Sequence, residues 1–155
     1  MAHYAWLDTD NTVINIIYGK DETEQLNEQD VNWEDLYLNA AQLIDSNVVS
    51  VKRTSYNTVY NEHWDTDEEG NRTLSADQSK TFRGNMATMG GKYLVDDDVF
   101  VGIQPYPSWI LTENWKWTFP VPMPDDYEIV PYEWDEDTVS WIQVDLENDT
   151  SNSNT

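Results

Sequence analysis

The 155-residue chain contains no cysteine, so it can form no disulfide and no thiolate metal site, and it has no thiol nucleophile. No apolar stretch approaches the roughly 18 residues of a membrane-spanning helix. Its amino terminus has no basic segment followed by a long apolar one, so we expect no signal peptide. These absences exclude thiol chemistry and a membrane span, but they do not fix the compartment.

Basic residues are scarce: 8 Lys and Arg stand against 30 Asp and Glu, for a formal net charge of −22. This charge repels nucleic-acid phosphates and anionic membranes, so we expect neither direct nucleic-acid binding nor membrane binding. Six of the eight bases lie between positions 52 and 92, and none follows position 121. The basic middle segment pairs either with the acidic ends of the fold or with an acidic neighbour.

Aromatic residues are abundant, with eight Trp, nine Tyr and three Phe. Each ring buries about 150–250 Å², so aromatic side chains can build a core that has few aliphatic ones. The length predicts a single β-rich domain over residues 1–146. Residues 147–155 are polar, and we expect them to form a mobile tail.

Short apolar runs separated by turn residues predict a β-rich fold, mainly β or α+β, of several short antiparallel hairpins with two short helices. The predicted hairpins cover residues 4–18, 92–101, 105–124 and 132–144. The first helix is expected over residues 33–44, where Trp33, Leu36, Tyr37, Ala40, Leu43 and Ile44 recur at helical spacing after a capping Asn32. The second is expected over residues 76–83, because Ser75 and Gln78 form a capping-box pattern.

The most distinctive stretch, residues 105–124, holds five of the six prolines and three of the eight tryptophans. Apolar runs on either side of Glu113-Asn114 predict a hairpin between two proline-stiffened arms. A two-residue loop and a four-residue loop give the same strand pairing. In that pairing Ile110 faces Trp117, and Trp109 points to the opposite face.

The face with Trp117 has more aromatic area, so we expect it to cover the core, together with Trp6, Trp33 and Trp134. Trp109 is then left for a partner, and the place of Trp115 stays open. Prolines fix φ and reduce the entropy lost on binding, and tryptophan often dominates binding energy. The predicted partner-binding residues are Pro105, Tyr106, Pro107, Trp109, Leu111, Pro120, Pro122 and Pro124.

No pattern in the sequence predicts catalysis, so we expect a protein that is not an enzyme and needs no cofactor. His3 and His63 lack metal-ligand spacing, and no nucleophile elbow surrounds Ser55 or Ser108. Residues 89–92 lack the spacing of a phosphate loop. With 30 acids in the chain, no particular carboxylate pair indicates glycoside hydrolysis.

Residues 65–70 (Asp-Thr-Asp-Glu-Glu-Gly) resemble the start of a calcium loop, with oxygens at alternate positions and glycine sixth. The twelfth position is Ala76, where the loop needs a bidentate glutamate. The segment is therefore expected to be a solvated acidic turn, and no metal site is predicted.

Three segments carry a resemblance to other proteins: residues 52–58 (Lys-Arg-Thr-Ser-Tyr-Asn-Thr), 77–85 (Asp-Gln-Ser-Lys-Thr-Phe-Arg-Gly-Asn) and 104–111 (Gln-Pro-Tyr-Pro-Ser-Trp-Ile-Leu). Through them the chain resembles short acidic, virion-associated proteins encoded by tailed phages of marine cyanobacteria and similar marine bacteria. The likeness ends at residues 45–47 and in the polar tail. It brings no catalytic motif, and it implies a virion component.

The sequence therefore predicts an accessory structural protein of a phage virion, with other capsid or tail proteins as partners and an open oligomeric state. Capsid decoration on the outside of the particle comes first, and attachment to a tail or fibre comes next. Two other classes fit an acidic, aromatic chain: a DNA mimic that inhibits a host enzyme, and a sugar-binding adhesin. Regularly spaced acids on a helix would favour the mimic, but here the acids cluster in turns.

Overall fold

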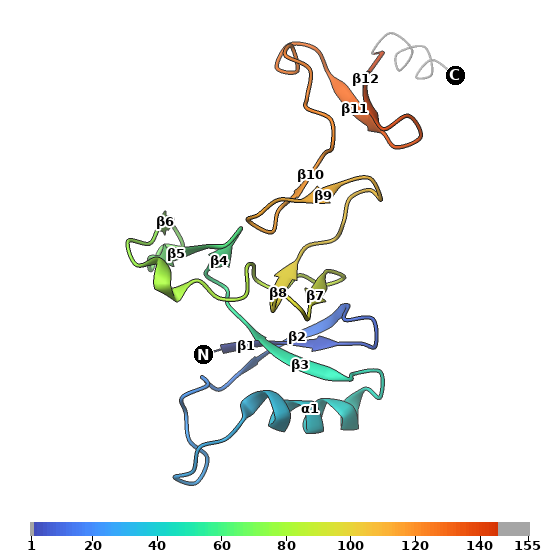
Figure 1. Ribbon diagram of the computed structural model, residues 1–155. Coiled ribbons are helices and arrows are strands. Elements are labelled where there is room, and N and C mark those ends of the chain that lie inside the picture. The colour runs from blue at the N-terminus through green and yellow to red at the C-terminus, as the bar shows by residue number, and fades with distance from the viewer. Residues whose placement is uncertain (1, 146–155) are drawn as a thin grey trace, which may run out of the picture. The chain divides into compact units, whose positions relative to one another are not determined.

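The computed structural model describes residues 2–145 (Figure 1). It confirms the β-rich class, with short antiparallel sheets and one α-helix among the described residues. The chain forms two compact units: unit 1 contains residues 1–104 and 111–116, and unit 2 contains residues 105–110 and 117–155. The prediction of one domain over residues 1–146 did not foresee this division, and the predicted tail at 147–155 lies outside the described residues.

Unit 1 is built on a three-stranded sheet in the order β2-β1-β3, with one helix. These elements are β1 (Ala2–Leu7), β2 (Val13–Gly19), β3 (Ser50–Thr54) and α1 (Trp33–Ile44). A second sheet follows in the order β4-β5-β6, and then a hairpin. Their bounds are β4 (Thr58–Val59), β5 (Glu62–Thr66), β6 (Arg72–Leu74), β7 (Lys92–Leu94) and β8 (Val99–Val101).

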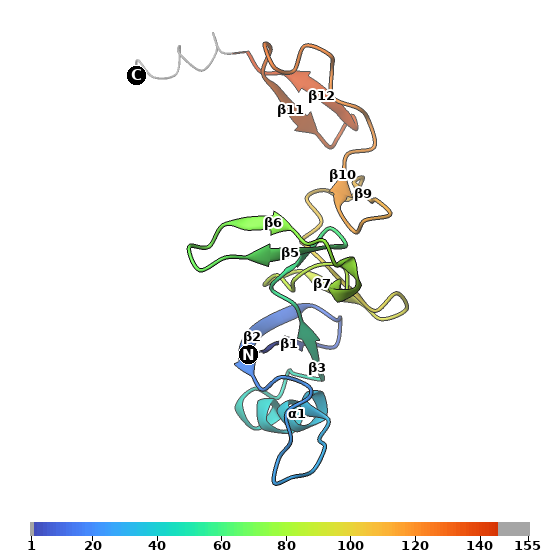
Figure 2. The same ribbon diagram turned by 90° about the vertical axis from the view of Figure 1, so that its left-hand side faces the viewer.

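Strand β1 lies at the centre of unit 1 and is buried on both faces. Tyr4 and Trp6 belong to a core cluster with Trp33 of the helix, while Ala5 and Leu7 pack in a second cluster with Phe100 of β8. Figures 1 and 2 accordingly show α1 on one side of this sheet and the β7–β8 hairpin on the other. Burial on both faces explains why this strand has a continuous apolar run in place of alternation.

The predicted helix over residues 33–44 is confirmed, and the Asn32 side chain caps it by accepting from the amide of Asp35 at 3.2 Å. Its buried residues are Trp33 and Ala41. The placement of Leu43 and Ile44 on the core face was wrong, because these side chains are 90% and 77% exposed. The buried stripe of the helix ends at Ala41, and Ala40, which the sequence also placed on the core face, is exposed.

The second predicted helix, over residues 76–83, is wrong: only a single 3₁₀ turn forms, at Gln78–Lys80. The capping-box residues have other partners. The Ser75 hydroxyl contacts Nδ1 of His63 at 2.7 Å. The side chain of Gln78 accepts from the backbone amide of His63 at 2.9 Å and donates to the His63 carbonyl at 3.0 Å. Asp77 caps the 3₁₀ turn in place of Ser75.

Segments 52–58 and 77–85, which carry the resemblance, meet inside unit 1 as a network of buried polar groups. The Thr58 hydroxyl accepts from the amide of Phe82 at 3.1 Å, and the Thr54 hydroxyl accepts from the amide of Ala87 at 2.7 Å. Asn85 donates to the carbonyl of Phe100 at 2.9 Å. These residues satisfy buried backbone groups, so their role in the structure is to hold unit 1 together.

Two of the six bases of the middle segment, Arg53 and Arg83, form ion pairs with acids of unit 1. Arg83 contacts Glu34 at 3.1 Å and Asp98 at 2.8 Å, and Arg53 contacts Glu22 at 3.1 Å.

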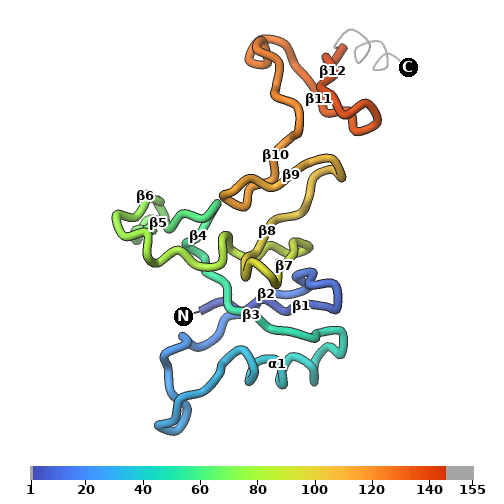
Figure 3. Tube along the Cα trace, viewed as in Figure 1, coloured from blue at the N-terminus to red at the C-terminus, as the bar shows by residue number. Residues whose placement is uncertain are grey.

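The remaining strands are β9 (Ile110–Leu111) with β10 (Trp117–Thr118), and β11 (Tyr132–Asp135) with β12 (Ser140–Gln143). Figure 3 follows the chain through them. The β11–β12 hairpin repeats the construction of β7–β8. Trp134 and Trp141 pair across its strands as Tyr93 and Phe100 do in β7–β8, and each loop has a residue of positive φ two positions before the second aromatic. No helix among residues 2–145 has the length and apolarity needed to cross a bilayer.

Candidate functional site: the aromatic unit

The eight residues predicted to bind a partner divide between the two units. Leu111 belongs to unit 1 and is half-buried, and the other seven belong to unit 2. Within unit 2, Trp109 and Pro124 are half-buried, whereas the exposed members are Pro105, Tyr106, Pro107, Pro120 and Pro122. The proline arms are thus largely open to solvent, but the tryptophan between them is not.

Five aromatic side chains of unit 2 form one connected cluster. Trp134 and Trp141 pair across the β11–β12 hairpin with ring centroids 5.1 Å apart at 74°. Trp109 meets Phe119 edge-on at 5.6 Å and Trp134 at 6.1 Å, and Phe119 meets Trp141 at 5.1 Å. Tyr106 contacts Trp109 at 5.8 Å. Edge-to-face contacts are the favoured geometry of such rings, so this cluster is the interior of unit 2.

The loop of the 105–124 hairpin differs from both predicted lengths. The amide of Thr112 donates to the carbonyl of Lys116 at 2.8 Å, and that of Trp115 donates to the carbonyl of Thr112 at 3.1 Å. Trp115 has a φ of 62°, in the left-handed region. These are the features of a three-residue loop that contains a type I turn followed by a bulge residue. Such a loop shifts the strand pairing by one residue from the predicted one.

The shift explains why the predicted faces were wrong. Moving one strand by one residue exchanges the faces of its side chains relative to the other strand. Trp109 therefore lies against Phe119, to which the sequence had assigned the opposite face. Ile110, predicted to face the core, is 55% exposed. Trp109, which was expected to bind a partner, thus packs within the aromatic cluster, and its neighbour Ile110 is the exposed residue.

Trp115, which the sequence left open, lies in unit 1. Its carbonyl accepts from the side chain of Asn85 at 2.9 Å, and its ring lies against Gly84. A Cβ at Gly84 would come within 3.0 Å of that ring, and the φ of Gly84 is +72°. Glycine at position 84 thus satisfies both the backbone conformation and the close approach of the indole.

One carboxylate joins the 105–110 arm to the β11–β12 hairpin. Glu136 accepts from the Ser108 amide at 2.9 Å, from the Ser108 hydroxyl at 2.7 Å and from the indole of Trp134 at 2.8 Å. The hydrogen bonds from Trp134 and Ser108 favour the charged form and hold the pKa of Glu136 below its ordinary value of 4.5. Ser108, considered from sequence as a nucleophile, instead serves as a donor in this structural link.

We expect unit 2 to lose its tryptophan packing in acid as Glu136 is protonated. Because its pKa is lowered in the folded state, the stabilisation is complete at neutral pH, declines below the ordinary value and is lost as the pH falls through the lowered pKa. A pH titration of the near-ultraviolet circular dichroism measures this. Glu136→Gln should reduce the signal already at neutral pH, and the exposed control Glu133→Gln should titrate like the parent. An unchanged titration in Glu136→Gln would contradict the assignment.

Unit 2 has an incomplete interior. Among its described residues none is buried, although five rings are in contact. A unit of this size rarely supplies enough core to be stable without a further cover or staple. Several of its large apolar side chains are exposed: Tyr106, Ile110, Val121, Tyr127, Ile129, Val139 and Ile142.

The charge of unit 2 has a single sign. Its sequence contains no Lys and no Arg. The acids among its described residues are Asp125, Asp126, Glu128, Glu133, Asp135, Glu136, Asp137 and Asp145. Any surface that covers unit 2 must therefore accommodate uncompensated negative charge.

A buried Ser–His pair in unit 1 has the residue types of a hydrolase site but not the geometry. The Ser75 hydroxyl and the Asp65 carboxylate both approach Nδ1 of His63, at 2.7 Å and 4.0 Å. A catalytic triad requires the acid and the nucleophile on different ring nitrogens. Ser75 is also only 5% exposed, so a substrate could not easily reach its hydroxyl. The pair instead connects Ser75 to His63 of β5 inside unit 1.

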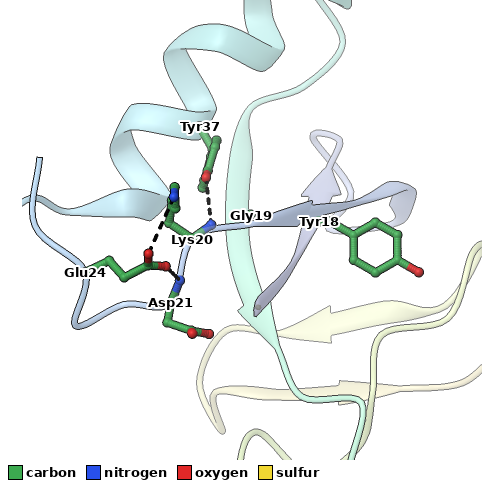
Figure 4. A pocket seen from close by; sticks show the side chains of 6 residues that line it. All are labelled: Tyr18, Gly19, Lys20, Asp21, Glu24 and Tyr37. Carbon is green, nitrogen blue, oxygen red and sulfur yellow. Dashed lines mark hydrogen bonds and ion pairs between the residues drawn. The ribbon is translucent and has the colours of Figure 1, made fainter.

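A surface pocket of about 460 Å³ lies at the end of β2, lined by Tyr18, Gly19, Lys20, Asp21, Glu24 and Tyr37 (Figure 4). Its polar groups serve one another. The Tyr37 hydroxyl accepts from the Lys20 amide at 2.9 Å, and Glu24 accepts from the Asp21 amide at 2.7 Å. Figure 4 shows the Tyr18 ring turned away from this group, and the hydroxyl of the other lining aromatic residue, Tyr37, is already bonded to the Lys20 amide.

The calcium-like segment at residues 65–70 forms a hydrogen-bonded turn. Asp67 accepts from the amides of Glu69 at 2.9 Å and Asn71 at 2.8 Å, and from the Asn71 side chain at 3.1 Å. The bonds from Asn71 lower the pKa of Asp67. One of the carboxylates that suggested a metal loop, that of Asp67, thus binds turn amides. Within residues 2–145, no group of three His, Asp or Glu side chains is arranged to hold a metal ion.

Comparison of the chain with family models, curated proteins and solved structures finds no match. The sequence located the aromatic and proline-rich arms, but not the role of Glu136 or the turn after residue 124. The only signal for Glu136 was its place in an acidic turn next to Trp134, which many surface turns share.

Proposed function

We propose that the protein is a non-enzymatic accessory component of a phage virion, bound to the outside of the particle through unit 2. One observation carries the proposal: unit 2 connects five aromatic rings, yet none of its described residues is buried. A small aromatic unit with an incomplete interior gains stability when a partner covers it. The resemblance to virion-associated phage proteins supplies the kind of partner, another protein of the same particle.

Capsid decoration is the first form of this proposal, and attachment to the tail or a fibre is the second. The net charge of −22 fits an outer position, because like charges keep particles apart in solution. The exposed prolines of the arms fit docking, since their φ is already fixed and little entropy remains to be lost.

We expect the protein to remain with gradient-purified particles at a fixed ratio to the other virion proteins. Quantitative mass spectrometry of the particle fraction measures that ratio. Separated heads and tails distinguish the two forms, because a decoration protein stays with the heads. Abundance in the infected lysate with absence from the particles would overturn the proposal and favour an acidic DNA mimic.

A further inference from the structure

The turn at residues 125–130 presents two bare apolar side chains in an acidic frame. Ile129 is 88% exposed and Tyr127 is 50% exposed. The three other side chains of residues 125–129 are the carboxylates Asp125, Asp126 and Glu128. Alternation of acidic and apolar residues on a surface turn is unfavourable for burial inside its own unit, but it suits insertion into another surface.

This turn is ordered by its own hydrogen bonds. The amide of Tyr127 donates to the carbonyl of Pro124 at 3.1 Å, and the amides of Ile129 and Val130 donate to the carbonyl of Asp126 at 2.9 Å and 2.8 Å. The Tyr132 hydroxyl donates to the Asp126 carboxylate at 2.8 Å and fixes the turn to β11. A preformed turn loses little conformational entropy when its apolar side chains enter a pocket.

The charge around the turn selects the occupant. No Lys or Arg occurs from residue 117 to residue 145, so nothing in this part of the chain offsets the three carboxylates. Burial beside them is favourable only against positive charge. Unit 2 of a second copy would bring the same negative surface to the contact, and nucleic acid or an anionic bilayer would also repel the turn.

We propose that the 125–130 turn inserts Ile129 and Tyr127 into an apolar pocket of another protein, and that Lys and Arg side chains rim this pocket. The inference rests on the proposed function, which supplies particles as the place to look for that partner. The 125–130 turn is then a second docking element, beside the 105–124 stretch, and its partner surface is apolar at the centre and basic at the edge. Ile129 acts as the central apolar anchor, while Asp125 and Glu128 steer the approach.

The anchor is tested by adding purified full-length protein back to particles of a phage that lacks its gene, with bound protein measured after sedimentation. Ile129→Ala should weaken binding about 30-fold, the effect of removing a central anchor. The matched control is Leu43→Ala in unit 1, where the leucine is 90% exposed. It should bind like the parent, and circular dichroism should show both variants folded.

The charged rim is tested with the double variant Asp125→Asn, Glu128→Gln. Asp126 is left unchanged because it holds the turn. This variant should associate more slowly, and its binding should depend less on salt. The control is the double variant Glu68→Gln, Glu69→Gln in an exposed turn of unit 1, which should keep the association rate and the salt dependence of the parent.

The outcomes separate the two proposals. Failure of the parent protein to bind particles overturns the proposed function. Parent binding that survives Ile129→Ala overturns the anchor alone, and binding insensitive to salt and to the charge variant overturns the basic rim. Self-association of the parent in analytical ultracentrifugation, abolished by Ile129→Ala, would make a second copy the occupant and overturn the inference.

Discussion

Replacement of Arg83 by alanine is expected to lower the free energy of unfolding of unit 1 by about 3 kcal/mol. The Arg83 side chain is only 13% exposed; it donates to Glu34 and to the carbonyl of Arg53 at 2.9 Å, and it forms an ion pair with Asp98. Its guanidinium also lies 4.9 Å from the ring centroid of Phe82. One side chain thus ties α1, β3 and the β7–β8 turn together.

The size of the loss follows from what the deletion leaves behind. Glu34 is 27% exposed, so its carboxylate would stay partly desolvated without its cation, which is the costly consequence of breaking a buried pair. Asp98 is 59% exposed and would be rehydrated at little cost. The expected value therefore lies at the lower end of the range for buried pairs.

Urea denaturation followed by far-ultraviolet circular dichroism measures this loss. Arg72→Ala is the matched control: Arg72 likewise lies over an aromatic ring, that of Tyr56, and donates to a backbone carbonyl, but it is exposed. We expect the control to change stability by less than about 1 kcal/mol. Arg83→Lys should show an intermediate loss, because an ammonium cannot reproduce the planar fork of donors. Equal stability of Arg83→Ala and Arg72→Ala would rule out the central role of this network.

The hairpins were predictable because their signals are local. Acidic and Asn-containing turns between β-branched or aromatic runs located β1–β2, β7–β8 and β11–β12. The helix at residues 33–44 was equally clear, since its cap and its aromatic positions lie within one short segment. In each case the residues that decide the conformation are close together in the chain.

The errors arose where a distant group decides. Ser75 and Gln78 have the pattern of a helix start, but His63 engages both, and no property of residues 75–83 announces that. The faces of the 105–124 hairpin depended on a loop length that differs by one residue from the predictions. The division into two units was likewise invisible, because residues 111–116 belong to unit 1 while both flanks belong to unit 2.

The partly correct site shows the same limit. Composition located the aromatic and proline-rich arms, in which Pro105, Tyr106, Pro107, Pro120 and Pro122 are exposed. Which tryptophan lies inside could not be read from composition, because that depends on the register of two strands and on Glu136, more than 20 residues away. Exposure of Ile129 was hidden as well, since an isoleucine in sequence ordinarily indicates a buried position.

Replacement of Trp109 by alanine is expected to unfold unit 2 while unit 1 stays folded. Trp109 contacts three other rings of the cluster, so its removal takes away most of the aromatic contact between the 105–110 arm and the rest of unit 2. A fully buried tryptophan costs about 3–5 kcal/mol on truncation, and a half-buried one about 2–3 kcal/mol. A unit in which no residue up to position 145 is buried has little more stability than that to lose.

The matched control is the next residue, Ile110→Ala, because Ile110 is 55% exposed. The paired indoles of Trp134 and Trp141 provide the measurement, since two rings 5.1 Å apart at 74° give an exciton-coupled band in the far-ultraviolet circular dichroism. We expect Trp109→Ala to abolish this band and Ile110→Ala to preserve it. Backbone amide spectra should meanwhile show the shifts of residues 2–104 unchanged in both variants. The reverse outcome, a band lost in Ile110→Ala and kept in Trp109→Ala, would restore the strand pairing predicted from sequence and return Trp109 to the partner-binding face.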